Sequence, residues 1–121
     1  MKKTLLLVLL SSLLSVSNSW ASAPAKEIRK IEMLIDTVKE LKEAEFIRNG
    51  RSYNSKIAVM FLNGKWKAKK KEISTADDFI TKIATKSSTS GKPYFIRFSD
   101  GKEQKSELFF KGLLNEMDPE E

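Results

Sequence analysis

The sequence contains neither cysteine nor histidine among its 121 residues. Without cysteine the chain forms no disulfide and carries no thioether-linked lipid, so an exported form depends on its hydrophobic core for stability. The absence of both residue types removes the usual ligands of zinc, copper and haem, and the absence of histidine removes the commonest general base. We therefore expect no metal, no cofactor and no catalytic residue, and an enzyme is the less favoured functional class.

Two patterns that could suggest catalysis have simpler explanations. Residues 87–92 resemble a phosphate-binding loop, but Lys86 and Pro93 stand where the Walker pattern requires Gly and Ser or Thr. Asp77 and Asp78 are neighbours at the predicted start of a helix, where they act as caps and point in different directions. Neither pattern predicts an active site.

The first 21 residues have the features of a cleavable export signal. Lys2 and Lys3 precede an apolar run over residues 5–16. This run is shorter than the roughly 20 residues that a membrane-spanning helix needs. The sequence therefore predicts a periplasmic protein with neither a membrane span nor a lipid anchor.

Cleavage after Ala21 or after Ala23 fits the small-x-small rule, but the second cut leaves Pro24 at the new N-terminus, so the first is favoured. The remaining residues 22–121 suffice for one small domain. Loss of the two leader lysines lowers the formal net charge from +6 to +4. This moderately basic balance favours anionic partners weakly and does not indicate nucleic acid.

The first half of the domain predicts a helix and a β-hairpin. Apolar residues recur at helical spacing over residues 25–44. Asn49-Gly50 then favours a type I′ turn, because both residues accept positive φ, and predicts a hairpin over residues 45–53.

Residues 54–71 fit two structures. Apolar residues at helical spacing follow a candidate cap at Ser52 or Asn54, and they are Ile57, Ala58, Phe61, Leu62 and Trp66. Asn63-Gly64 is also the signature of a hairpin turn. We favour a helix over residues 57–66 with Phe61 and Trp66 facing the core, because their packing offsets the roughly 1 kcal/mol that Gly costs inside a helix.

The clearest local signal is a short capped helix after residue 73. Ser74 or Thr75 can cap it, and the S-x-x-D and T-x-x-D spacings place Asp77 and Asp78 to complete a capping box. The apolar stripe of this helix comprises Ala76, Phe79, Ile80, Ile83 and Ala84.

A hydroxyl-rich loop, a strand and a last helix follow. Gly91 ends the loop, Pro93 excludes further helix, and residues 94–98 predict a strand. The last helix begins at Ser106, and Gly112 in its middle suggests close approach to another element. Its expected apolar residues are Leu108, Phe109, Leu113, Leu114 and Met117.

These elements predict a single α+β domain, with about four helices packed on a small antiparallel sheet that residues 45–53 and 94–98 form. We expect the two main apolar stripes to be buried together, and they comprise Phe79, Ile80, Ile83, Ile31, Leu34 and Val38.

Lysines are concentrated near the end of the predicted second helix. Five occur within seven residues, namely Lys65, Lys67, Lys69, Lys70 and Lys71. They fit a solvated helix end whose cations complement the helix dipole. They also fit a docking patch for phosphate- or carboxylate-rich envelope material, with Trp66 either in the core or stacked on a sugar.

Two polar blocks resemble a known family. They are Phe46-Ile47-Arg48-Asn49-Gly50 and Ser87-Ser88-Thr89-Ser90-Gly91-Lys92-Pro93-Tyr94, with Lys65-Trp66 and Thr75-Ala76 between them. Together they resemble the YfeK-like family of short exported bacterial proteins, a domain of unknown function. The resemblance implies a periplasmic address and supplies no activity. Family members often carry His in an A-x-x-H-L pattern where Phe61 stands, and this departure argues further against catalysis.

Backbone geometry explains the glycines of these blocks but not their polar side chains. Backbone N–H groups near Ser88, Ser90 and Gly91 could form an anion nest beside Lys92, or the loop is simply a polar connector. The candidate binding surface comprises Arg48, Asn49, Lys67, Lys69, Lys70, Lys71, Ser88, Ser90 and Lys92.

These features favour a non-catalytic periplasmic binding or interaction module. Its expected partner is an anionic envelope component, such as a lipid headgroup, lipopolysaccharide or cell wall, or else an envelope protein. The alternative is a small enzyme that acts on cell-wall or lipid material through carboxylates. That alternative requires a cleft that holds a carboxylate with a raised pKa.

Overall fold

The computed structural model describes residues 23–117. The predicted leader and residues 118–121 lie outside the described residues. No described helix is long and apolar enough to cross a membrane. The described chain forms, in order, α2 (Ala25–Glu40), β1 (Glu45–Arg48), β2 (Arg51–Tyr53), α3 (Ser55–Ala68), the 3₁₀ helix η2 (Lys70–Glu72), α4 (Ala76–Lys82), β3 (Phe95–Arg97), β4 (Glu103–Lys105) and α5 (Ser106–Met117). The expected small α+β domain is confirmed.

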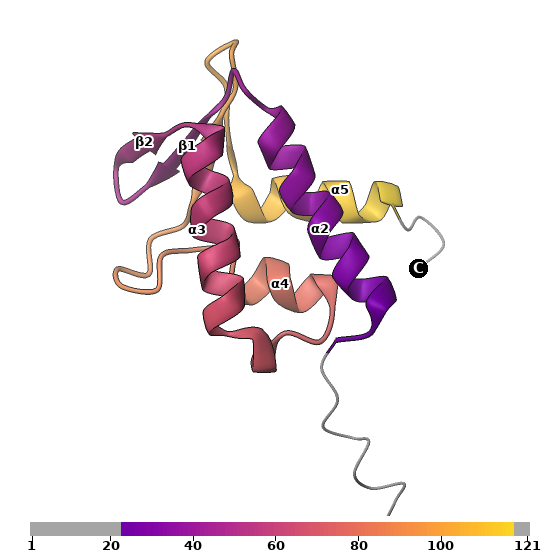
Figure 1. Ribbon diagram of the computed structural model, residues 1–121. Coiled ribbons are helices and arrows are strands. Elements are labelled where there is room, and N and C mark those ends of the chain that lie inside the picture. Colours follow the sequence, from indigo (N-terminus) through magenta and orange to yellow (C-terminus); the bar gives the residue numbers. More distant parts are fainter. Residues whose placement is uncertain (1–22, 118–121) are drawn as a thin grey trace, which may run out of the picture.

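The helices surround one hydrophobic core. Figure 1 shows α2 and α3 side by side, with α4 across their lower ends and α5 behind them. The predicted joint burial of the α2 and α4 stripes is confirmed, because Ile31, Leu34, Val38, Phe79, Ile80 and Ile83 are all buried in a single cluster. Helix α2 ends at Glu40, four residues before the predicted end, because Leu41 leaves the helical conformation.

The sheet has four antiparallel strands in the order β2-β1-β3-β4. Phe46 pairs with Ile96, which is fully buried, so this pair lies on the helix side of the sheet. Because side chains alternate along a strand, the neighbouring pair Ile47 and Phe95 points to the other face. The predicted hairpin is confirmed: Asn49 (φ 53°) and Gly50 (φ 78°) both adopt the left-handed conformation that a type I′ turn requires.

Helix α3 resolves the two alternatives for residues 54–71 in favour of a helix. Asn54 is its N-cap, and its Oδ1 accepts a hydrogen bond from the Ile57 amide at 2.9 Å. Trp66 faces the core and meets the ring of Phe79 edge-to-face at 5.9 Å. The core position predicted for Phe61 is wrong, because its side chain is 38% exposed. The buried stripe of α3 runs through Ala58 and Leu62, and Phe61 lies one residue to the side of it.

Helix α4 begins with the predicted capping box. Thr75 is the N-cap, Asp78 completes the box, and Thr75 Oγ1 accepts from the Asp78 amide at 3.0 Å. The helix ends at Lys82, yet Ile83 and Ala84 remain buried as expected.

Two expectations for the last helix are wrong. Leu108 is 57% exposed, and Phe110 is the buried aromatic of α5 instead. Within the described part of the chain, a side chain at Gly112 would meet no atom within 4 Å, so no described element approaches it closely. The sequence also did not predict β4, whose three residues are all exposed.

Candidate functional site

An apolar cleft opens between the β1–β2 hairpin and α3. Its buried lining includes Ala58, Leu62, Ala84 and Phe110. Among the more exposed lining residues we call one group the rim, and it comprises Arg48, Tyr53, Phe61, Lys65 and Tyr94. The cavity volume is about 50 Å³, and one water molecule needs about 10–15 Å³ of such space. The cleft therefore accepts a small apolar group, and it is smaller than the ligand pockets of about 300–1,000 Å³ that are usual in proteins.

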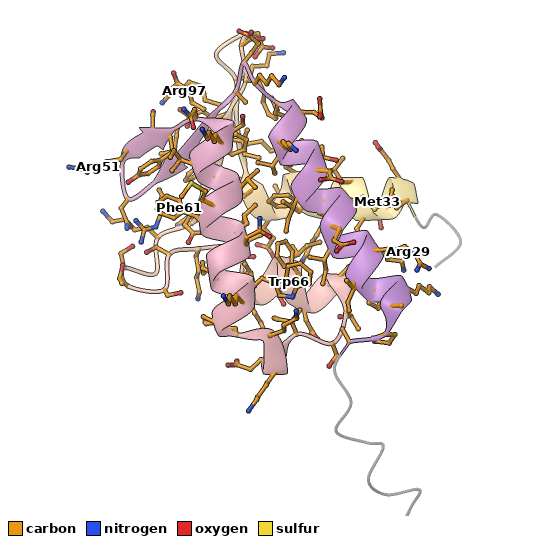
Figure 2. All side chains as sticks on the ribbon, viewed as in Figure 1. Arg29, Met33, Arg51, Phe61, Trp66 and Arg97 are labelled. Atoms are coloured by element: carbon orange, nitrogen blue, oxygen red, sulfur yellow. The ribbon has the colours of Figure 1, made fainter. Side chains whose placement is uncertain are left out.

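Arg48 lies at the rim, over the ring of Phe61. Its Cζ atom is 5.1 Å from the ring centroid, and Phe61 in turn meets the ring of Tyr53 edge-to-face at 5.1 Å. Figure 2 shows Phe61 on the side of α3 that faces the hairpin, with Arg51 pointing outward at the far edge of the hairpin. This contact with an aromatic face holds the half-buried guanidinium in place.

The guanidinium of Arg48 has no acceptor within residues 23–117. No hydrogen bond or ion pair joins it to any of these residues. Arg97 on β3 differs, because its guanidinium contacts Glu45 at 2.8 Å and Glu103 at 2.7 Å. Glu103, the nearer of these carboxylates, is the main reason that the pKa of Arg97 is raised. A guanidinium carries five N–H donors, so those of Arg48 are available to an anion from outside.

Lys65 supplies a second cation to the rim. Its Nζ donates to the Lys86 carbonyl at 3.1 Å and to the Tyr94 hydroxyl at 3.0 Å, and it lies 4.9 Å from the centroid of the Tyr94 ring. An ammonium group has three donors, so one is left for a ligand. Phe61 and Lys65 are four residues apart on α3 and therefore share one helix face. The rim thus presents two cations, each over an aromatic ring of its own.

Among the described residues, none that lines this cleft carries a carboxylate. Within residues 23–117 no three acidic side chains come together as a metal site requires. The one carboxyl with a clearly shifted pKa in this part of the chain is Glu27, remote from the cleft. Its pKa is lowered, mainly because the Ala76 amide donates to it at 2.8 Å. The described lining of the cleft therefore offers no carboxylate as a general acid or base.

The structure brings three of the predicted site residues to one place. Asn49 at the hairpin tip donates from Nδ2 to Ser87 Oγ at 3.2 Å, and its Oδ1 accepts from Ser90 Oγ. Ser90 Oγ also accepts from the Lys92 amide at 3.2 Å. We call this hydrogen-bonded set the loop clamp, because it ties residues 87–92 to the hairpin.

The loop clamp uses most of the amides that an anion nest would need. The amides of Thr89 and Ser90 donate to Ser87 Oγ, and the amide of Gly91 donates to the Ser87 carbonyl at 3.0 Å. Ser88 and the Lys92 side chain are exposed beside it. The geometry favours a connector here, and it fixes the segment that carries Tyr94 to the cleft.

The predicted lysine cluster is divided by the fold. Lys65 turns to the cleft, whereas α3 ends at Ala68 and the chain continues through the 3₁₀ turn η2. Lys67, Lys70 and Lys71 are exposed, Lys69 is half-buried, and Lys70 Nζ lies 5.5 Å from the Trp66 ring. Of the predicted site residues, Arg48 alone belongs to the cleft.

Sequence reasoning missed the rest of the rim, namely Tyr53, Phe61, Lys65 and Tyr94. The spacing of Phe61 and Lys65 was a usable signal, since it places an aromatic ring and a cation on one face of a helix. The approach of Arg48 and Tyr94 to that face depends on tertiary packing.

Comparison with known proteins gives a family and no activity. A family model described as a family of unknown function, DUF5329, matches residues 25–118. The "Uncharacterized protein YfeK" of Salmonella typhimurium is 36% identical over 83 residues, which are 69% of each chain. No solved structure matches this chain.

Proposed function

The chain belongs to the DUF5329 family of unknown function, and from this premise we propose that it is a non-catalytic binding module of the periplasm. Its ligand is an anion attached to a small apolar group, presented by an envelope component or a partner protein. The anion is bound by Arg48 and Lys65, and the apolar group enters the cleft between them.

One observation carries this proposal: Arg48 is half-buried over Phe61 and has no acceptor within residues 23–117. A planar guanidinium binds carboxylate or phosphate through two parallel hydrogen bonds. A charged hydrogen bond contributes about 1.5–3 kcal/mol, which is about 10-fold to 100-fold in affinity.

The lining adds selectivity for the group that carries the charge. A cleft of about 50 Å³ lined by Leu62, Ala84 and Phe110 rewards one small apolar group, at about 25 cal/mol per Å² of apolar area that leaves water. A bare inorganic anion gains nothing from this lining. The site therefore suits the end of a larger molecule, and the rest of that molecule lies outside the cleft.

The enzymatic alternative has less support. Acid–base catalysis by carboxylates needs an acidic side chain within reach of the bound ligand, and the lining of the cleft offers none. The hydroxyl of Tyr94 is already engaged with Lys65.

Chemical-shift mapping tests the proposal. Phenylacetate carries both an anion and an apolar ring, and phenylacetamide is its uncharged counterpart. We expect phenylacetate to shift the backbone amides of Arg48, Phe61, Lys65 and Tyr94, with at least 10-fold weaker binding by the amide. Equal binding by the two compounds, or shifts confined to another surface, would refute it.

A further inference from the structure

We propose that a second surface, remote from the cleft and independent of the proposed function, binds an anionic lipid bilayer. It lies where α3 ends and α2 begins, at the lower end of the molecule in Figure 1. We call it the cationic pole, and it comprises Lys67, Lys69, Lys70, Lys71 and Lys82.

The fold adds one distant cation to the four lysines that the sequence places together. The chain turns sharply after Ala68, because Lys69 leaves the helix and η2 follows at once. Lys82, ten residues beyond Glu72, returns to the same place, and its Nζ donates to the Glu72 carbonyl at 3.1 Å. Lys82 therefore joins one surface with Lys67 of α3, Lys69, and Lys70 and Lys71 of η2.

The acidic residues near the pole neutralise it only in part. Asp78 is engaged in the capping box, where its carboxylate accepts from the amides of Ser74 at 2.9 Å and Thr75 at 3.3 Å. Glu72 and Asp77 are exposed. Glu27, at the same end, is paired with Lys30 at 3.2 Å, so the balance of the five pole lysines against the other three carboxylates remains positive.

The beginning of α2 lies at this same end. Glu27 Oε1 accepts from the Ala76 amide at 2.8 Å, so the first turn of α2 contacts the start of α4. Figure 2 shows Arg29 on this lower part of α2. The first turn of α2 therefore lies beside the pole.

At the opposite end of the described chain, lysines stand close to acidic residues in the sequence, as Lys42 does to Glu43 and Lys105 to Glu103. Lys42, Lys56, Lys102 and Lys105 are all exposed and supply a matched set of four lysines away from the pole.

Vesicle co-sedimentation tests this inference. The exported protein is mixed with vesicles of phosphatidylcholine alone or of phosphatidylcholine with phosphatidylglycerol, at about 0.1 M and about 1 M salt. The screening length falls between these conditions from about 10 Å to about 3 Å. We expect binding to the anionic vesicles at low salt only.

Two variants distinguish an effect of the pole from an effect of the net charge of the protein. One changes Lys67, Lys69, Lys70 and Lys71 to Gln, and the control changes Lys42, Lys56, Lys102 and Lys105 to Gln. Each lysine close to an anionic surface raises the partitioning of the protein onto the vesicles about fivefold. With at least two of the four substituted lysines in contact with the bilayer, the pole variant should bind about 25-fold less than the wild type. The control should change by no more than a few-fold. Equal losses in the two variants, no binding by the wild type, or binding that persists at high salt would overturn the inference.

Discussion

Replacing Phe79 with Ala tests the packing on which the whole domain depends. Phe79 is fully buried where α4 meets α2 and α3, and its ring meets that of Trp66 at 5.9 Å. A Phe→Ala change at such a site costs about 3–5 kcal/mol, because it removes apolar contacts and leaves a cavity. Small domains have a total stability of about 5–15 kcal/mol, so this loss is a large fraction of it.

Phe61→Ala is the matched control, since it removes the same atoms from a side chain that is 38% exposed. Its neighbours Tyr53 and Arg48 lie at the surface and can close over the gap. We expect a cost of at most about half that of Phe79→Ala, because solvent already reaches part of the ring.

Thermal unfolding followed by circular dichroism measures both changes. For a domain of this size 1 kcal/mol corresponds to about 4–8 °C in Tm, so Phe79→Ala should melt at least about 12 °C below the wild type. A Phe79→Ala protein that melts within about 5 °C of the wild type, or a Phe61→Ala protein that loses as much, would refute the core assignment.

Two further predictions concern the contacts that join distant segments. The pKa of Glu27 is lowered in the folded protein, so its carboxylate stabilises the fold at pH values above its ordinary pKa near 4.5. This contribution is lost as the pH falls through the lower pKa of the folded protein. Glu27→Gln should therefore lower Tm near pH 7 and converge with the wild type below pH 4.5; a constant difference across this range would contradict the assignment. Asn49→Gly keeps the left-handed turn but removes the loop clamp, so it should lower the free energy of unfolding by about 1–2 kcal/mol. It should also speed hydrogen exchange at the amides of Thr89 and Ser90. Unchanged exchange would show that the loop keeps its conformation without Asn49.

The elements that the sequence predicted well are those in which every local signal agrees. Thr75, Asp78 and the apolar stripe around Phe79 define α4 without help from the rest of the chain. Asn49-Gly50 likewise fixes its turn, because both residues tolerate positive φ.

The errors occur where a neighbouring element decides the outcome. Phe61 and Leu108 lie beside the buried stripes of their helices, and their exposure depends on what packs against that edge. Strand β4 is made of Glu103, Gln104 and Lys105, which have no strand pattern of their own; pairing with β3 makes them a strand.

The candidate site could be predicted only in part for the same reason. Arg48 was identified because turn geometry does not require an arginine there, but its partner ring is thirteen residues away on another element. Lys65 was grouped with the lysines that follow it, and the fold turns it to Tyr94 instead. Proximity in sequence groups Lys67, Lys69, Lys70 and Lys71 correctly but does not show that Lys65 leaves this group.

The most direct test of the proposed function is the affinity of phenylacetate for three proteins: the wild type, Arg48→Gln and Arg51→Gln. Arg51 pairs with Arg48 across the hairpin and is exposed, so the two variants lose the same charge at neighbouring positions of one hairpin. The proposed function predicts that Arg48→Gln weakens binding by about 10-fold or more, whereas Arg51→Gln leaves it within about twofold. Equal effects of the two substitutions, or no effect of either, would contradict the assignment of Arg48 as the anion-binding group of the cleft.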